Sequence, residues 1–245
     1  VPYKLVKMSS DKLKVILLAG RGVKKLPNKE EMNLLTSLDW LVHCFGENNL
    51  TDITLIGGKD INYIGNKYPN INIIHNSNWD RSGPVFSLFL AEQILCTSDC
   101  LISYVDVVYR EELVRDFINS VSSNIKVVND LGWKKRYKDR TAKSFDRAEK
   151  IWLNKSGGLQ KMSLVDEGSL SPDGEYAGLM FVSKEKSRVL IDKYKDEIYS
   201  SSDYNFPDFF NLLLNEGEEI DSFGTYGNWA ELDSNKSDGK QLLDL

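Results

Sequence analysis

The strongest constraint on the fold is the way short apolar runs alternate with longer amphipathic stretches in the first half of the chain. Residues 13–18 form a nearly continuous apolar run that stops at Ala19-Gly20, a pattern typical of a buried strand in a parallel sheet. Residues 32–45 instead place leucine, valine and phenylalanine along one stripe of a helix. Strands that alternate with helices predict an α/β fold with right-handed crossovers.

The same reasoning divides the rest of the chain into elements. We expect strands at 52–56, 71–74, 100–105, 125–128, 177–182 and 220–223, helices at 84–96, 111–121, 184–198 and 207–214, and a hairpin from 151–153 and 159–164. Residues 133–147 are rich in basic and aromatic side chains and are expected to form an excursion over the sheet edge. Because no linker separates these elements, the sequence predicts one α/β domain, with a mainly parallel twisted sheet flanked by helices and a small β excursion.

Composition narrows the class of protein. With 41% hydrophobic and 27% charged residues, the 245-residue chain has ordinary globular usage. The formal net charge of -5 does not indicate a basic surface that would bind phosphate groups, so we expect neither nucleic acid nor a membrane as partner. No run approaches the ~18 apolar residues of a membrane span, and the first residues lack the core of a signal peptide, which predicts a soluble, cytoplasmic protein. The three cysteines are expected to be buried thiols, and only two histidines argue against a multi-histidine metal site.

The segment that follows the first strand has the composition of a phosphate-binding loop. Glycines at 20 and 22 allow backbone N–H groups to close around phosphate oxygens, and Arg21, Lys24 and Lys25 supply positive charge. The glycine spacing matches neither the dinucleotide fingerprint nor a Walker loop. A tight turn with solvated lysines is an equally good interpretation of this segment alone.

Carboxylates at two distant positions suit a divalent cation. Asp106 ends an apolar strand, and Glu231 and Asp233 follow late in the chain in the sequence WAELDS. Mg²⁺ takes oxygen ligands and needs few of them from the protein. Taken separately, Asp106 could equally cap a helix, and the late pair could be a solvated strand end.

Together these three segments resemble the nucleotidyltransferases, which join nucleoside triphosphates to phosphorylated small molecules. The resemblance spans the whole chain and implies a Rossmann-like nucleotidyltransferase fold, with residues 1–130 binding the nucleotide and 131–245 binding the acceptor and completing the metal site. It implies that Mg²⁺ is held by Asp106 and Asp233, with Lys24 as a third catalytic residue. The family arginine of the first motif is replaced by Lys24, or by Lys25 in a longer loop, and Lys29 stands near the next family lysine.

Residues 130–140 are similar to the phosphocholine cytidylyltransferase-like branch, which also holds enzymes for phosphonates and inositol phosphate. That resemblance implies CTP as the nucleotide and a small phosphate or phosphonate acceptor, such as phosphocholine or an aminoalkyl phosphonate. It implies nucleotide binding by Leu18, Ala19, Gly20, Arg21, Gly22, Lys24, Lys25, Asn78, Gly83 and Ser87. It implies acceptor binding by Asp130, Trp133, Tyr137, Arg140, Glu175, Tyr204, Asp208 and Glu231.

Alternatives remain open at this level. The aromatic residues among the acceptor positions could enclose an ammonium group or simply pack in the core. A sugar-phosphate nucleotidyltransferase that uses UTP, dTTP or GTP would have the same motifs, and a regulatory copy of the fold would lack activity altogether. A homodimer is expected only because relatives in such families often form one.

Overall fold

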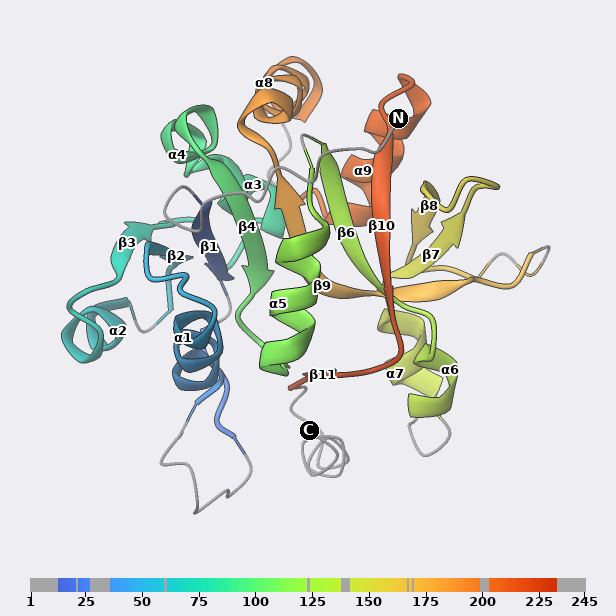
Figure 1. Ribbon diagram of the computed structural model, residues 1–245. Coiled ribbons are helices and arrows are strands. Elements are labelled where there is room, and N and C mark those ends of the chain that lie inside the picture. Colours follow the sequence, from blue (N-terminus) through green and yellow to red (C-terminus); the bar gives the residue numbers. More distant parts are fainter. Residues whose placement is uncertain are drawn as a thin grey trace, which may run out of the picture.

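The computed structural model describes residues 13–20, 22–26, 36–59, 61–122, 124–137, 142–166, 168, 170–198 and 203–232. Its core is a twisted sheet with the strand order β10-β6-β9-β4-β1-β2-β3 (Figure 1). These strands are β10 (Ile220–Thr225), β6 (Ile125–Asp130), β9 (Gly174–Val182), β4 (Asp99–Tyr104), β1 (Leu13–Ala19), β2 (Ile53–Gly57) and β3 (Asn72–His75). The predicted α/β class and mainly parallel sheet are confirmed.

One strand of this seven-strand path, β9, runs opposite to the other six. β1 pairs in parallel with β2 and β4, β2 with β3, and β10 with β6. β9 runs antiparallel to both of its neighbours, β4 and β6. The predicted hairpin, β7 (Lys150–Leu153) and β8 (Leu159–Ser163), is attached through β7 to the first residues of β9. The excursion is therefore continuous with the main sheet.

Helices cover both faces of the sheet and bury the alternating residues of its strands. Val15 and Leu17 of β1 pack in one hydrophobic cluster with helices α1 (Ser37–Glu47), α2 (Ile61–Lys67) and α5 (Glu111–Ser120). Ile16 and Leu18 face a second cluster with α3 (Pro84–Phe89), α4 (Glu92–Thr97), α8 (Lys184–Lys193) and α9 (Phe206–Asn215). Successive strand side chains point to opposite faces, so β1 is apolar on both sides, as its sequence predicts.

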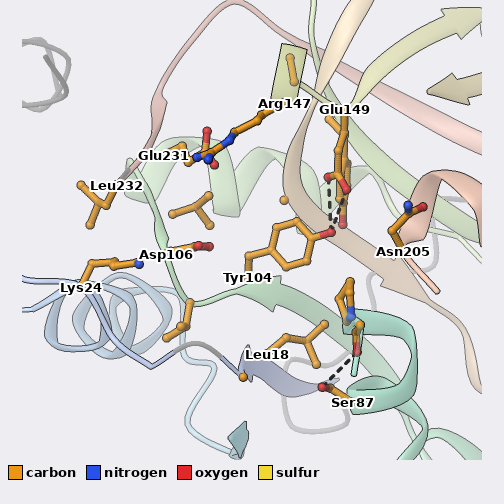
Figure 2. A pocket seen from close by; sticks show the side chains of 18 of the residues that line it. Leu18, Lys24, Ser87, Tyr104, Asp106, Arg147, Glu149, Asn205, Glu231 and Leu232 are labelled. Carbon is orange, nitrogen blue, oxygen red and sulfur yellow. Dashed lines mark hydrogen bonds between the residues drawn. The ribbon is translucent and has the colours of Figure 1, made fainter. Parts of the chain in front are cut away.

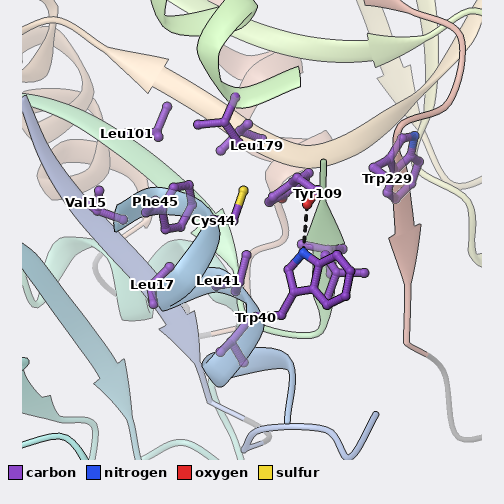
Figure 3. Packing of buried hydrophobic residues seen from close by; sticks show 14 of the residues in the cluster. Val15, Leu17, Trp40, Leu41, Cys44, Phe45, Leu101, Tyr109, Leu179 and Trp229 are labelled. Carbon is purple, nitrogen blue, oxygen red and sulfur yellow. Dashed lines mark hydrogen bonds between the residues drawn. The ribbon is translucent and has the colours of Figure 1, made fainter. Parts of the chain in front are cut away.

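A small two-stranded sheet lies beside the main one. β5 (Val107–Tyr109) pairs antiparallel with β11 (Trp229–Glu231). The indole Nε1 of Trp40 on α1 donates a 2.7 Å hydrogen bond to the Tyr109 carbonyl oxygen, which fixes β5 to the helix (Figure 3). Because β5 begins directly after the β4 turn, this pairing brings the end of the described chain back to the middle of the sheet.

Several predicted elements differ from those observed. The helix expected at 84–96 divides into α3 and α4, with a break at Leu90 and Ala91. The helix expected at 184–198 is α-helical only to Lys193 and continues as a π-helix to Ile198. Residues 133–147 contain two short helices, α6 (Trp133–Arg136) and α7 (Ala142–Arg147). Strands β5 and β11, with three residues each, and the seven-residue helix α2 were not predicted, because segments this short show no clear period.

The exposure of the cysteines and the length of the helices can also be compared with the sequence predictions. Cys44 and Cys100 are buried, but Cys96 is exposed, because it lies on the solvent side of α4. The expectation of three buried thiols is therefore wrong for Cys96. Within the described ranges, no helix has the length and apolar character needed to cross a membrane.

Candidate active site

A cavity of about 710 Å³ opens at the carboxyl ends of β1 and β4. Open α/β sheets bind ligands at this edge. Side chains line this cavity from both of its ends (Figure 2). Lys24, Asp106 and Glu231 lie toward one end, Glu149 and Asn205 toward the other, and Tyr104 lies between them.

The glycine-containing loop forms one wall of the cavity. Gly22 has a positive φ of 80°, and its N–H donates to the Ala19 carbonyl at 2.9 Å, which closes the turn after β1. A residue with a Cβ rarely adopts this backbone conformation. The loop therefore lies at the end of β1, the place where the sequence predicts phosphate binding.

The start of helix α1 holds the backbone of Lys24. The Lys24 N–H donates to Ser37 Oγ at 3.1 Å, and the Ser37 N–H donates to the Lys24 carbonyl at 2.8 Å. Thr36, the N-cap of α1, forms an isolated β-bridge with Lys25. These bonds fix the residue from which the Lys24 side chain reaches into the cavity (Figure 2).

Asp106 and Glu231 meet in the cavity because β5 and β11 pair. Glu231 stands opposite Val107 in the register, and the Leu232 N–H donates to the Asp106 carbonyl at 2.7 Å. Both acidic side chains are half-buried in the cavity wall. Asp233, the second predicted metal ligand, is next in the sequence but lies outside the described residues.

The carboxylate oxygens of Asp106 and Glu231 are of the kind that a hard divalent cation binds. Carboxylate oxygens are the ligands that Mg²⁺ prefers, and a site of one or two carboxylates completed by water and phosphate is usual for it. Among the residues that the structure describes, no group of three or more acidic, histidine or cysteine side chains is arranged to hold a metal. A cation at Asp106 would therefore depend on substrate oxygens or on Asp233.

A pair of half-buried polar residues, Tyr104 and Glu149, forms the opposite wall. The Tyr104 hydroxyl donates to Glu149, at 3.1 Å from Oε1 and 3.3 Å from Oε2. Burial raises the pKa of Glu149, the Tyr104 hydrogen bond lowers it, and the negative charges of Glu231, Glu175 and Asp106 raise it. Together these effects take the pKa from 4.5 to about 8. Burial also raises the pKa of Tyr104 well above its usual value, so this phenol keeps its proton.

Lys150 connects the segments that carry this wall. Its ammonium group is almost wholly buried, with 1% of the residue exposed. It donates to the carbonyl oxygens of Phe145, Ala148 and Leu164, at 2.9, 3.3 and 2.7 Å. Three N–H groups thus meet three carbonyls, which saturates the donors of a lysine. The end of α7 and the segment after β8 are held together directly beside Glu149.

Comparisons with known proteins agree with this architecture. No family model matches the chain. A CTP:phosphoglutamine cytidylyltransferase of Campylobacter jejuni is 24% identical over 242 residues, covering 89% of this chain and 94% of that protein. The inositol-1-phosphate CTP transferase of T. maritima superposes with a TM-score of 0.70 at 15% identity, covering 94% of both chains. The CTP:phosphocholine cytidylyltransferase of Streptococcus pneumoniae superposes with a TM-score of 0.65 at 15% identity, covering 95% and 98%.

The chain has the nucleotidyltransferase fold. The resemblance expected from the sequence is confirmed, since these similar proteins are cytidylyltransferases of the expected branch. Within this fold, the cavity collects part of the predicted site. The predicted residues that line it are Leu18, Gly20, Gly22, Lys24, Gly83, Ser87, Asp106, Glu175 and Glu231.

Other predicted residues lie elsewhere in the described structure. Ala19 is buried in β1, and Lys25, Asn78 and Asp208 are exposed positions outside the described lining of the cavity. Tyr204 is half-buried next to the lining residues Asp203 and Asn205. Arg21, Lys29 and Arg140 lie outside the described residues, as does Asp233.

The carboxylate of Asp130 is used in hydrogen bonds within the protein. It is fully buried, and its Oδ2 accepts the indole N–H of Trp229 at 3.0 Å. Its Oδ1 accepts the backbone N–H groups of Gly132 and Gly227, at 2.8 and 3.1 Å. This carboxylate therefore holds the turn that leads into β11, and it is outside the described lining of the cavity.

The aromatic residues expected around an ammonium group are mostly inside the protein. Trp133 is 1% exposed and stacks on Phe145, with ring centroids 5.2 Å apart. Tyr137 packs edge-on against both rings, and its hydroxyl donates to Glu175. Of the two interpretations left open by the sequence, core packing describes these residues.

The sequence alone did not single out several lining residues. Asp146, Arg147, Ala148 and Asp203 line the cavity without having been predicted as site residues. Asp146 and Arg147 lie in the basic and aromatic stretch 133–147, which showed no strong strand period, so the sequence did not indicate which of its side chains face the cavity.

Proposed function

We propose that the protein is a Mg²⁺-dependent cytidylyltransferase, which transfers CMP from CTP to a small phosphate or phosphonate acceptor and releases pyrophosphate. One observation supports this most: the anchored Lys24 loop, the strand-ending Asp106 and the late Glu231 line the same cavity. CTP is supported by the names of the three similar proteins reported above, each of which is a CTP transferase or cytidylyltransferase. An acceptor of the phosphocholine or aminoalkyl phosphonate kind is the finer part of the proposal.

In the proposed reaction, an acceptor oxygen forms a bond to the α-phosphorus of CTP, and the bond from that phosphorus to the β-phosphate oxygen breaks. The acceptor oxygen is already anionic near neutral pH, so no strong general base is required. Charge repulsion between two anions is the main barrier. Lys24 and the N–H groups of the glycine loop would bind the triphosphate, and Arg147 would offset charge on the acceptor phosphate.

Asp106, together with Asp233, would hold the magnesium ion. When bound, the ion neutralises phosphate charge and aligns the reacting groups. Tyr104 and Glu149 would form the floor on which the acceptor rests, because they line the cavity beyond Asp106. Glu149 is not needed as a base in this scheme.

The test is pyrophosphate release from purified protein with Mg²⁺, one nucleoside triphosphate and one acceptor at a time. CTP, UTP, dTTP and GTP should be combined with phosphocholine, phosphoethanolamine, 2-aminoethylphosphonate and glucose-1-phosphate. We expect release with CTP and an amine-bearing acceptor. Release only with UTP, dTTP or GTP and the sugar phosphate would replace this proposal with a sugar-phosphate nucleotidyltransferase, and inertness with every pair would indicate a regulatory copy.

A further inference from the structure

Among the described residues that line the cavity, acidic side chains outnumber basic ones, although both proposed substrates are anions. Its described lining includes two cationic side chains, those of Lys24 and Arg147. It also includes six acidic side chains, from Asp106, Asp146, Glu149, Glu175, Asp203 and Glu231. Glu149, with its pKa raised to about 8, is mostly protonated near neutral pH in the absence of a ligand. Lys24 and Asp106 lie at one end of the cavity in Figure 2, and Glu149 at the other. A divalent ion at Asp106 would balance charge at the first end, and a cationic group on the ligand would be the counter-ion for Glu149 at the second end.

We propose that Glu149, oriented by Tyr104, selects an acceptor that carries a primary ammonium group by accepting its N–H hydrogen bonds. This inference rests on the proposed function and adds the residue that determines acceptor specificity.

The hydrogen bonds of Glu149 leave room for such a group. Tyr104 supplies one O–H, shared between the two carboxylate oxygens. A carboxylate has about four lone-pair sites, so capacity remains on the side that faces the cavity. Tyr104 also fixes the carboxylate in place, because its own ring packs against Tyr176 and Phe206 at centroid distances of 5.9 and 5.7 Å.

The aromatic packing argues against a methylated ammonium group. Trimethylammonium is bound chiefly by the open faces of aromatic rings. The ring of Tyr104 has neighbouring rings beside it, Tyr176 is 3% exposed, and Trp229 is 4% exposed. Tyr104 therefore presents a hydroxyl to Glu149 instead of an open ring face to the ligand. Hydrogen-bond acceptors, which a quaternary ammonium group cannot use, are what this end of the cavity offers.

The high pKa of Glu149 is consistent with this role. Burial and nearby carboxylates disfavour the ionised form, and the pKa rises to about 8. A ligand ammonium beside Glu149 would favour the ionised form again, because an opposite charge lowers the pKa of a carboxyl group. The buried carboxylate is thus better satisfied with a cationic ligand than without one.

The test uses binding, which does not depend on turnover. Phosphoethanolamine and phosphocholine have the same phosphate and differ only in N-methylation, and the affinity of each for the full-length protein is measured by isothermal titration calorimetry. We expect phosphoethanolamine to bind at least about tenfold more tightly, the size of a hydrogen bond to a charged group. Glu149→Gln should lose at least about tenfold in phosphoethanolamine affinity and bring the two affinities within about twofold.

Tyr104→Phe and a surface carboxylate complete the set. Tyr104→Phe keeps the ring but not the O–H, and should lose about threefold in phosphoethanolamine affinity. Glu47→Gln, at an exposed position at the end of α1, should bind like the wild type. CTP affinity and the unfolding transition, measured for every variant, should show that Glu149→Gln remains folded with an intact nucleotide site.

The outcomes separate this inference from the proposed function. Equal affinity of wild type for the two compounds, no binding of either, or a Glu149→Gln variant that keeps the preference would each overturn the role of Glu149, whether or not pyrophosphate is formed. A preference that Glu149→Gln abolishes, in a protein that forms no pyrophosphate with any pair, would support the inference and refute the proposed transferase.

Discussion

The two walls of the cavity are built by different means. On the β1 and β4 side, functional positions are fixed by backbone geometry: strand ends, a glycine turn, and the paired N–H and carbonyl groups of Lys24 and Ser37. On the side that carries Glu149, positions are fixed by buried side chains, with Lys150 bonded to three carbonyls and Tyr104 to a carboxylate. A backbone-built wall tolerates side-chain change, whereas the other depends on individual polar side chains.

The largest effect on activity is expected from Asp106, which follows β4 in the wall on the β1 and β4 side (the first wall). Asp106→Asn keeps the shape of the side chain but removes its charge, so kcat/KM for pyrophosphate release should fall by about 10²- to 10³-fold, as for loss of one preorganised electrostatic group. The unfolding transition should be almost unchanged, because backbone pairing holds this position. An Asp106→Asn variant with wild-type kcat/KM would contradict the metal role of this residue.

Substitution of Lys150 tests how the wall that carries Glu149 (the second wall) is held in place. Lys150→Met leaves three buried carbonyl oxygens without their ammonium donor, and the free energy of unfolding should fall by about 3 kcal/mol. Urea denaturation measures this change. Lys155→Met, at an exposed position in the β7–β8 turn, provides the matched control and should change stability by less than about 0.5 kcal/mol. Equal stabilities of the two variants would show that the side-chain network does not hold this wall.

Glu149 predicts a pH dependence of stability. Its pKa is raised from 4.5 to about 8 in the folded chain, so the native state keeps a proton that the unfolded state releases above pH 4.5. The contribution of Glu149 to stability therefore falls as pH rises from about 4.5 to about 8. Relative to the wild type, Glu149→Gln should be more stable at pH 8.5 than at pH 4, by a margin on the order of a few kcal/mol. A difference that does not vary with pH would refute the raised pKa.

The smallest effect is expected at Ser37. Ser37→Ala removes the Oγ that accepts the Lys24 N–H but leaves the bond from the Ser37 N–H to Lys24, so kcat/KM should fall only about fivefold. Ser187→Ala is the matched control, because Ser187 is also fully buried and its hydroxyl bonds within α8. Both variants should lose about 1 kcal/mol of stability, and only Ser37→Ala should lose activity. Equal activities would show that Lys24 does not need this anchor.

The first wall was largely predictable from the sequence, because its determinants are local. An apolar run that ends in glycines, and an aspartate after another apolar run, indicate strand ends, and parallel strand ends converge at one edge of a sheet. Gly22, Lys24 and Asp106 follow from that rule alone. The parallel pairing of β1 with β2 and β4 then places them in one cavity.

The second wall was not predictable in the same way, because its determinants are long-range pairings. From the sequence, Lys150 would be expected on the surface. It is buried because β7 pairs with β9 and because the ends of α7 and β8 lie around its side chain. Asp130 resembled a ligand-binding acid, but the turn before β11 uses its two oxygens instead. The three-residue strands β5 and β11 have too few residues to show a period, yet their pairing sets Glu231 beside Asp106.

Strand β9 has a practical consequence for redesign of the acceptor preference. It contributes Glu175 and Tyr176 to the cavity while it pairs with β4 and β6 over most of its length, and a Cβ at its first residue, Gly174, would stand 1.8 Å from Asn129 Oδ1. Libraries that vary this strand would sacrifice folding and binding together. Asp146, Arg147 and Asp203 reach the same cavity from outside the central sheet with exposed side chains, and they are the positions where substrate range can be diversified while the scaffold is preserved.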